Sequence, residues 1–131
     1  MIDPTDPAVT LLFVLTPLLV TFLAQRLYLH LINHNTDLYI LGHNVHHLFV
    51  GIAMAVPAAL VLAFPLDSDW LRLGALAVLG SGVSMILDEF VFLIATDGSN
   101  DSYLKPISLW SAIVLHAGTV ALLLLLYALS M

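Results

Sequence analysis

Five of the six histidines in this 131-residue chain lie between Tyr28 and Gly51. The five are His30, His34, His43, His46 and His47. A neutral imidazole ring ligates transition metals, and the same ring gains and loses a proton near neutral pH. A cluster of this kind is therefore suited to metal binding or to proton transfer.

Two adjacent carboxylic acids, Asp88 and Glu89, stand inside an apolar stretch, and Glu89 is the only glutamate of the chain. A charged carboxylate in the middle of a membrane helix costs roughly 2.5 kcal/mol or more, so such residues are functional candidates by default. The sixth histidine, His116, lies in the last apolar stretch. The alternative is a set of hydrogen-bonded polar groups that serve packing alone.

The composition places these residues in a membrane protein whose expected partner is lipid. Hydrophobic residues make up 61% of the chain and charged residues 9%, far outside the range of soluble domains. The absence of cysteine excludes disulfides, Fe–S clusters and thiolate zinc sites. With three basic residues and a formal charge of -6, the chain offers no surface for nucleic acid.

Four stretches are long and apolar enough for membrane-spanning helices, which need about 20 residues each. They cover residues 8–32, 38–64, 69–96 and 106–131, and short polar connections join them. The prediction is an all-α fold, a four-transmembrane-helix antiparallel bundle. Residues 1–131 form a single integral membrane domain, with both termini on the side opposite the histidines.

The polar residues of the predicted helices fall at one depth. Counted from the helix ends at 1.5 Å per residue, they lie roughly 8 to 15 Å below one membrane face. These residues are His43, His46, His47, Asp88, Glu89 and His116. Small residues continue from them at helical spacing, and such seams usually pack against neighbouring helices. The seams are His43, His47, Gly51 and Ala55; Gly74, Ala77, Ser81, Ser84 and Asp88; and Ser108, Ala112 and His116.

A divalent metal ion is the simplest way to hold several imidazoles and two carboxylates together. The predicted ligands are His43, His46, His47, Asp88 and Glu89, with His30, His34 and His116 as secondary candidates. The lack of thiolate favours zinc or non-haem iron over copper(I). A metal-bound water would act on a lipid-like substrate, as a hydrolase with zinc or as an oxygenase or desaturase with iron. No residue decides whether the protein is an enzyme.

The segments HLINH and HNVHH are separated by eight residues. They resemble the first two histidine boxes of the membrane fatty acid hydroxylase and sterol desaturase superfamily. That resemblance implies a di-metal centre that oxidises lipid C–H bonds. The later boxes of that superfamily are missing here, so Asp88 and Glu89, or a second subunit, would have to complete the ligand set.

A longer resemblance covers residues 46–114 through the segments HHLFVG, GSGVSMILDEF and SYLKPISLWSAIV. These segments are similar to a group of small prokaryotic four-helix integral membrane proteins with HH-x3-G and LDE[FI] segments. The resemblance implies one unit with two accessory residues. The unit is His46, His47, Asp88 and Glu89, and the accessories are His43 and Tyr103.

Two other classes of function stay open. A haem group between helices would take His47 and His116 as its axial pair, although Asp88 and Glu89 would then lie beside the negative charge of the porphyrin. Alternatively, the histidines and carboxyl groups form a proton or cation path, or the chain is an accessory subunit of a larger membrane complex or a homo-oligomer.

The predicted location is the cell membrane. Arg26 and Lys105 lie near the histidine side, whereas Arg72 lies on the opposite side. The positive-inside rule therefore predicts that the histidine side faces the cytoplasm.

Overall fold

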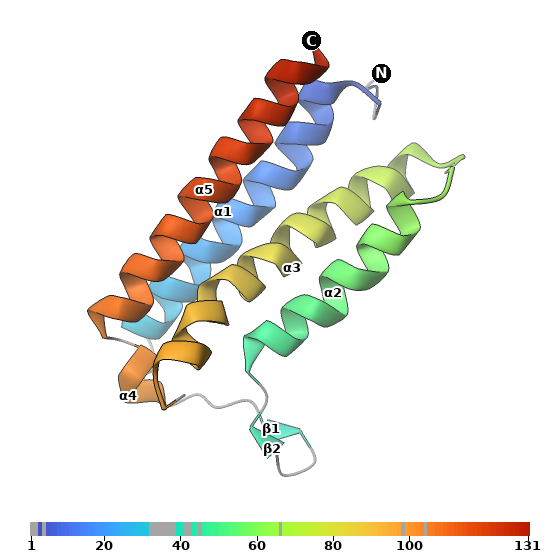
Figure 1. Ribbon diagram of the computed structural model, residues 1–131. Helices are drawn as coiled ribbons and strands as arrows, with labels where there is room; N and C mark the ends of the chain where they lie inside the picture. Colours follow the sequence, from blue (N-terminus) through green and yellow to red (C-terminus); the bar gives the residue numbers. More distant parts are fainter. Residues whose placement is uncertain are drawn as a thin grey trace.

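The computed structural model describes residues 3, 5–31, 39–40, 43–44, 46–65, 67–97, 99–103 and 105–131. The fold is an all-α antiparallel bundle, as predicted. Its elements are α1 (Pro7–Leu31), β1 (Tyr39–Ile40), β2 (His43–Asn44), α2 (His47–Leu62), α3 (Asp69–Ala95), α4 (Asn100–Tyr103) and α5 (Pro106–Ser130). The two short strands pair with each other in antiparallel fashion. Both chain ends lie at one end of the bundle, and α4 and the strand pair lie at the other (Figure 1).

Three helices, α1, α3 and α5, are long and apolar enough to cross a membrane. The second predicted span is too long at its start, because α2 begins at His47 instead of Leu38 and has 16 residues. It rises about 24 Å, less than the roughly 30 Å of a hydrocarbon core. The segment LGHNVHH, with glycine, asparagine and valine, has low helix propensity.

The late start of α2 corrects two predictions about the histidines. His43 lies in β2, and His46 precedes the helix in an extended conformation. His43, His46 and His47 therefore do not share one helix face. The depth that was counted from Leu38 is also wrong for them, because His47 stands at the very start of α2.

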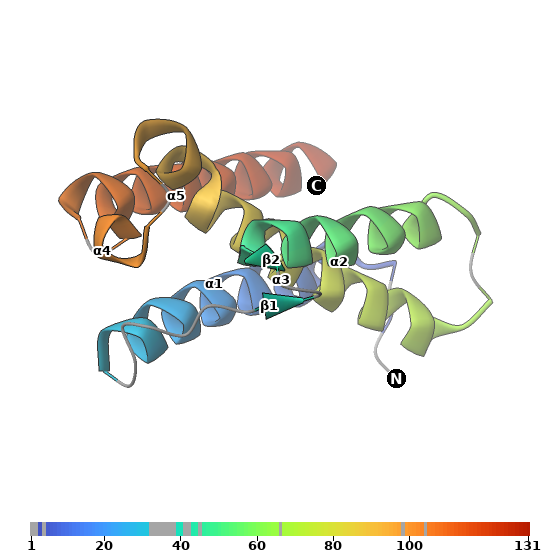
Figure 2. The ribbon, with the colours of Figure 1, turned by 90° about the horizontal axis from the view of Figure 1, so that it is seen from below.

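The central element of the bundle is α3, which packs against α1, α2 and α5. Among the described helices, α2 has its extensive packing with α3 alone. Seen from the end that carries α4, α2 and α5 lie apart from each other (Figure 2). Residues on different faces of α3 therefore meet different partners.

Glycines allow the backbones to approach closely at the middle of α3. A Cβ atom on Gly82 would lie 2.7 Å from the carbonyl oxygen of Gly51 in α2, and a Cβ on Gly80 would overlap the backbone of Val14 in α1. Residues two apart on a helix point about 200° apart, so α1 and α2 approach α3 from nearly opposite sides. Gly74, predicted to belong to the packed seam, is exposed with open space around it.

Candidate functional site

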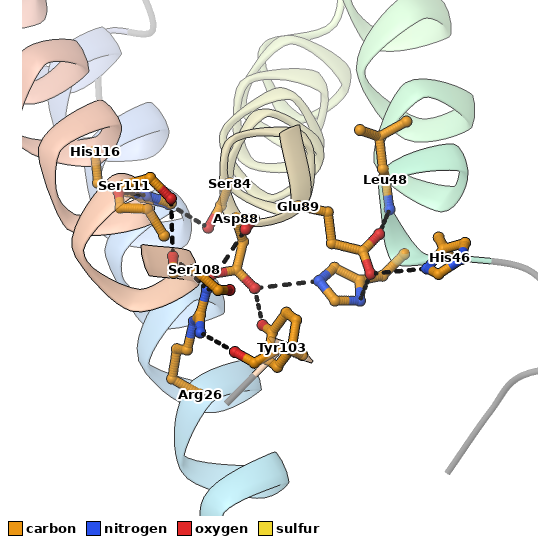
Figure 3. A network of polar contacts seen from close by, with 12 residues as sticks. Arg26, His46, Leu48, Ser84, Asp88, Glu89, Tyr103, Ser108, Ser111 and His116 are labelled. Atoms are coloured by element: carbon orange, nitrogen blue, oxygen red, sulfur yellow. Dashed lines mark hydrogen bonds and ion pairs between the residues drawn. The ribbon is translucent and has the colours of Figure 1, made fainter. Parts of the chain in front are cut away.

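The site is a network of polar side chains at the end of the bundle that carries α4 (Figure 3). Asp88 lies at its centre, and its side chain is 0% exposed. Arg26 of α1 donates from Nε to Asp88 Oδ1 over 2.7 Å, and its Nη2 donates to Ser108 Oγ of α5 over 3.2 Å. The network therefore joins α1, α3 and α5 through one buried ion pair.

Tyr103 closes the network from α4. Its hydroxyl donates to Asp88 Oδ2, and its ring lies 4.2 Å below the guanidinium carbon of Arg26. Edge-on contacts with His47 and Phe92 hold the ring in place. Burial raises the pKa of the Tyr103 phenol far above its usual range, and the charge of Asp88 raises it further. The hydroxyl therefore stays protonated and acts as a donor.

Glu89 faces the other way, toward the start of α2. The first backbone N–H groups of a helix lack partners within the helix, and the His46 side chain does not cap α2. Glu89 replaces the missing cap from α3, because its Oε2 accepts the N–H of Leu48 over 2.7 Å. Its Oε1 lies 3.3 Å from His46 Nδ1. The first turn of α2 thereby obtains a negatively charged acceptor from α3.

His47 lies between the two carboxylates. Its Nε2 is hydrogen-bonded to Asp88 Oδ2 at 3.1 Å, and its Nδ1 lies 3.2 Å from Glu89 Oε1. In a neutral imidazole only one ring nitrogen carries hydrogen, so the other would present a lone pair to an oxygen. The Nε2 contact with Asp88 is a hydrogen bond, whereas the Nδ1 contact with Glu89 is a close approach that a proton on His47 or on a carboxylate would make attractive.

The seam of small residues brings His47 and the carboxylates together. Gly51, one turn after His47, and Gly82, two turns before Glu89, meet backbone to backbone. Because α2 and α3 are antiparallel, His47 and Glu89 lie on the same side of this contact. The prediction that His47, Gly51 and Ala55 line the packed face of α2 agrees with the burial of Gly51 and Ala55.

His116 belongs to a second polar contact, on the α5 side of α3. Its Nε2 lies 3.1 Å from Ser84 Oγ, and its Nδ1 donates to the carbonyl oxygen of Ala112 over 2.8 Å. The ring of Phe22 covers it, with ring centres 4.2 Å apart. The predicted seam of Ser108, Ala112 and His116 is buried. Since both nitrogens of His116 have partners, neither is available to a haem iron in this arrangement.

The structure brings together four of the predicted metal ligands, His46, His47, Asp88 and Glu89. Within the described residues, however, no group of three or more such side chains has the geometry to hold a metal ion. His34 lies outside the described residues, as do the side chains of His30 and His43. The described residues by themselves do not fit a metal centre, and the larger ligand set stays a prediction.

The sequence reasoning missed Arg26 as a member of the site and used it only for membrane orientation. The available signal was an arginine inside an apolar helix, which needs a buried or aqueous partner. Asp88 is that partner. Tyr103 was predicted only as an accessory residue, through the resemblance to small four-helix membrane proteins.

A search for matching protein-family models, curated proteins and solved structures finds no match to this chain. The site must therefore be interpreted from its own geometry.

Proposed function

We propose that this membrane protein works by reversible proton binding at His47, between the carboxylates of Asp88 and Glu89. The observation that carries the proposal is the pair of contacts from the two ring nitrogens, 3.1 Å to Asp88 and 3.2 Å to Glu89. An imidazole with carboxylate oxygens at both nitrogens changes its interaction with each of them when it gains or loses one proton.

Charge balance supports this proposal. Asp88 and Glu89 contribute two negative charges, Arg26 contributes one positive charge, and a proton on His47 contributes the second. The sum is zero, as a site with nearly full burial of both carboxylates requires. Loss of the proton would leave one unbalanced negative charge beside the start of α2.

Such a centre suits a function coupled to protons. Titratable groups that face the interior of a helix bundle commonly belong to proton relays or to ion pathways in membrane proteins. The proposed class is therefore proton-coupled transport or conduction, or a subunit that supplies protonation to a larger membrane complex. Substrate chemistry is not needed to explain these contacts.

Nitrogen-15 NMR of histidine-labelled protein in detergent tests the proposal. We expect the His47 signal to report two protonated ring nitrogens at neutral pH, or a carboxylic acid band of Glu89 in the infrared spectrum. The His47→Gln variant assigns the signal, and His116→Gln is the matched control that leaves it in place. A neutral His47 beside an ionised Glu89 would overturn the proposal.

The second candidate is the metal-dependent protein, in which zinc or non-haem iron acts on lipid-like substrates. One observation favours it: Nδ1 of His46 and Nδ1 of His47 approach the same oxygen, Glu89 Oε1, at 3.3 and 3.2 Å. Further ligands would have to come from His30, His34 or His43. Elemental analysis of protein purified without added metal separates the candidates, because one ion per chain supports this one and excludes a site balanced by protons alone.

A further inference from the structure

Because α2 is shorter than α3, no helix among the described residues continues α2 past its start at His47. The two helices are antiparallel and are joined at the end far from the site by residues 63–68. From that end, the 27 residues of α3 rise about 40 Å, but the 16 residues of α2 rise about 24 Å. The last turns of α3 therefore extend beyond the start of α2.

Apolar side chains continue past the site on the neighbouring helices. Ile94, six residues beyond Asp88, is 72% exposed, and Leu31, five residues beyond Arg26, is 70% exposed. These positions lie roughly 8 to 9 Å farther toward the membrane face than the ion pair, at 1.5 Å per residue. Exposed isoleucine and leucine are suited to hydrocarbon, so on α1 and α3 the apolar zone extends beyond the level of the site.

His46 and His47 nevertheless remain partly exposed at this level. Each imidazole is 24% exposed, whereas the side chains of Asp88 and Glu89 are 0% and 4% exposed. Rings that are paired with buried carboxylates would lose much of their solvation if hydrocarbon covered them. The exposed part of each ring is therefore suited to contact with water.

We infer that an aqueous inlet reaches His46 and His47 at the start of α2, from the membrane face that carries α4 and the strand pair. It admits water and small hydrated ions, and it excludes lipid chains from the two imidazoles. The inference deepens the proposed function and rests on it in one respect, since it names water at that face as the source of the His47 proton. The exposure of the two rings, which carries the inference, does not depend on titration.

Single cysteines test the inlet cleanly, because the natural chain has none. The variants are His46→Cys in the inlet, Ile94→Cys on the apolar surface nearer the membrane face, and Val56→Cys as a control on the exposed face of α2. Vesicles are treated on one side at a time with a membrane-impermeant cationic methanethiosulfonate. Only thiols in water ionise and react, so we expect His46→Cys to react on the order of tenfold faster than the other two, from one side.

Depth alone predicts the opposite order, since Ile94 lies nearer the membrane face. Equal or faster reaction of Ile94→Cys would overturn the inference, as would no reaction of a folded His46→Cys variant from either side. If that variant does not fold, carbethoxylation of the wild-type protein replaces it: His46 should be modified and His116 should not. Modification of both or of neither would contradict the inlet. A reactive His46→Cys together with a neutral His47 would keep the inlet and reject the proposed function.

Discussion

His47 and His116 are both histidines that pair with side chains of α3, but their surroundings differ. His47 pairs with Asp88, and His116 pairs with Ser84, which lies one helical turn before Asp88. Carboxylates flank both nitrogens of His47, and its side chain is 24% exposed. His116 is 3% exposed, and its nitrogens meet a hydroxyl and a carbonyl. A neutral ring satisfies both hydrogen bonds of His116, whereas the proposed function places an added proton at His47.

Burial alone would select His116, the more deeply buried ring, as the histidine that exchanges a proton, although its partners are neutral. The more deeply buried ring is held by neutral groups and has no need to titrate. The chemical type of the partner decides the role, because a carboxylate stabilises an imidazolium and a hydroxyl does not. The charged layer around Asp88 and the neutral layer around Ser84 should therefore respond differently to the same kind of change.

The largest expected effect comes from removing the negative charge of Asp88, at the centre of the charged layer. Asp88→Ala leaves the guanidinium of Arg26 buried without its partner, which should lower the free energy of unfolding by about 3 to 5 kcal/mol. Thermal unfolding in mild detergent measures the change. The control is Asp69→Ala, an exposed residue in the first turn of α3, which should cost less than about 1 kcal/mol. Adding Arg26→Met to Asp88→Ala should restore part of the loss, and no restoration would argue against the ion pair as its cause.

A smaller effect should follow from moving α2 away from α3. A methyl group on Gly82 would meet backbone atoms of Gly51 and Ala55 at 2.7 and 2.8 Å, so Gly82→Ala forces the helices apart. We expect a loss of about 1 to 3 kcal/mol in the free energy of unfolding, together with a changed His47 NMR signal. The His116 signal should stay, because its hydrogen bonds involve α3 and α5 and its ring contact involves α1, so none of them depends on α2.

Gly74 provides the matched control for this substitution. It lies in the same helix with nothing near its missing side chain. Gly74→Ala should therefore be neutral or should stabilise the helix by up to about 1 kcal/mol. Equal losses for both glycine variants would mean that the contact of Gly82 with Gly51 does not position the charged layer.

Much of the fold follows from the apolar pattern of the chain. Runs long enough to span a membrane predict α1, α3 and α5, and turn residues predict their connections. The start of α2 does not follow from the length of the predicted span, because residues 38–64 take in LGHNVHH, a largely polar segment with low helix propensity. The acceptor that stabilises the actual start is Glu89, which is far away in sequence.

The candidate site is predicted only in part for a similar reason. Helical spacing selects His47 through its seam with Gly51 and Ala55, depth selects Asp88 and Glu89, and the structure brings these three together. The same rules group His116 with them, although its partner is Ser84. Spacing gives the face of a helix but not the neighbour that this face meets. For that reason the contribution of Arg26 from α1 becomes visible only in the folded chain.

The neutral layer should be the weaker of the two. Ser84→Ala removes the hydroxyl that bonds His116, and hydrogen bonds between membrane helices contribute about 0.6 kcal/mol on average and at most about 1.7 kcal/mol. We expect a stability loss in that range and an unchanged His47 signal. A loss as large as that of Asp88→Ala would contradict the expectation that the neutral layer around Ser84 contributes less stability than the charged layer around Asp88.

The smallest effect concerns the turn that carries Tyr103 to the charged layer. Asp97 Oδ1 accepts hydrogen bonds from Ser102 Oγ at 2.6 Å and from Ser99 Oγ at 2.8 Å, and these bonds, with Ser102 first, lower the pKa of Asp97 below its ordinary 3.8. A carboxyl group whose folded pKa is depressed contributes stability above its unfolded pKa and loses it as the pH falls through the folded value. The contribution of Asp97 should therefore be complete at neutral pH and decline only below pH 3.8.

Carbon-13 NMR of the Asp97 carboxyl group measures this directly, with the ordinary aspartate pKa of 3.8 as the reference. We expect Asp97 to keep the shift of an ionised group well below pH 3.8 on acidification. In Ser102→Ala, Asp97 should titrate closer to pH 3.8, because the first of its stabilising hydrogen bonds is gone. Titration of Asp97 at its ordinary value in the wild-type protein would show that the turn is not fixed in this way. Tyr103 would then be held at Asp88 by its own hydroxyl and ring contacts alone, and the charged layer would depend on α4 less than the hydrogen bonds of Asp97 imply.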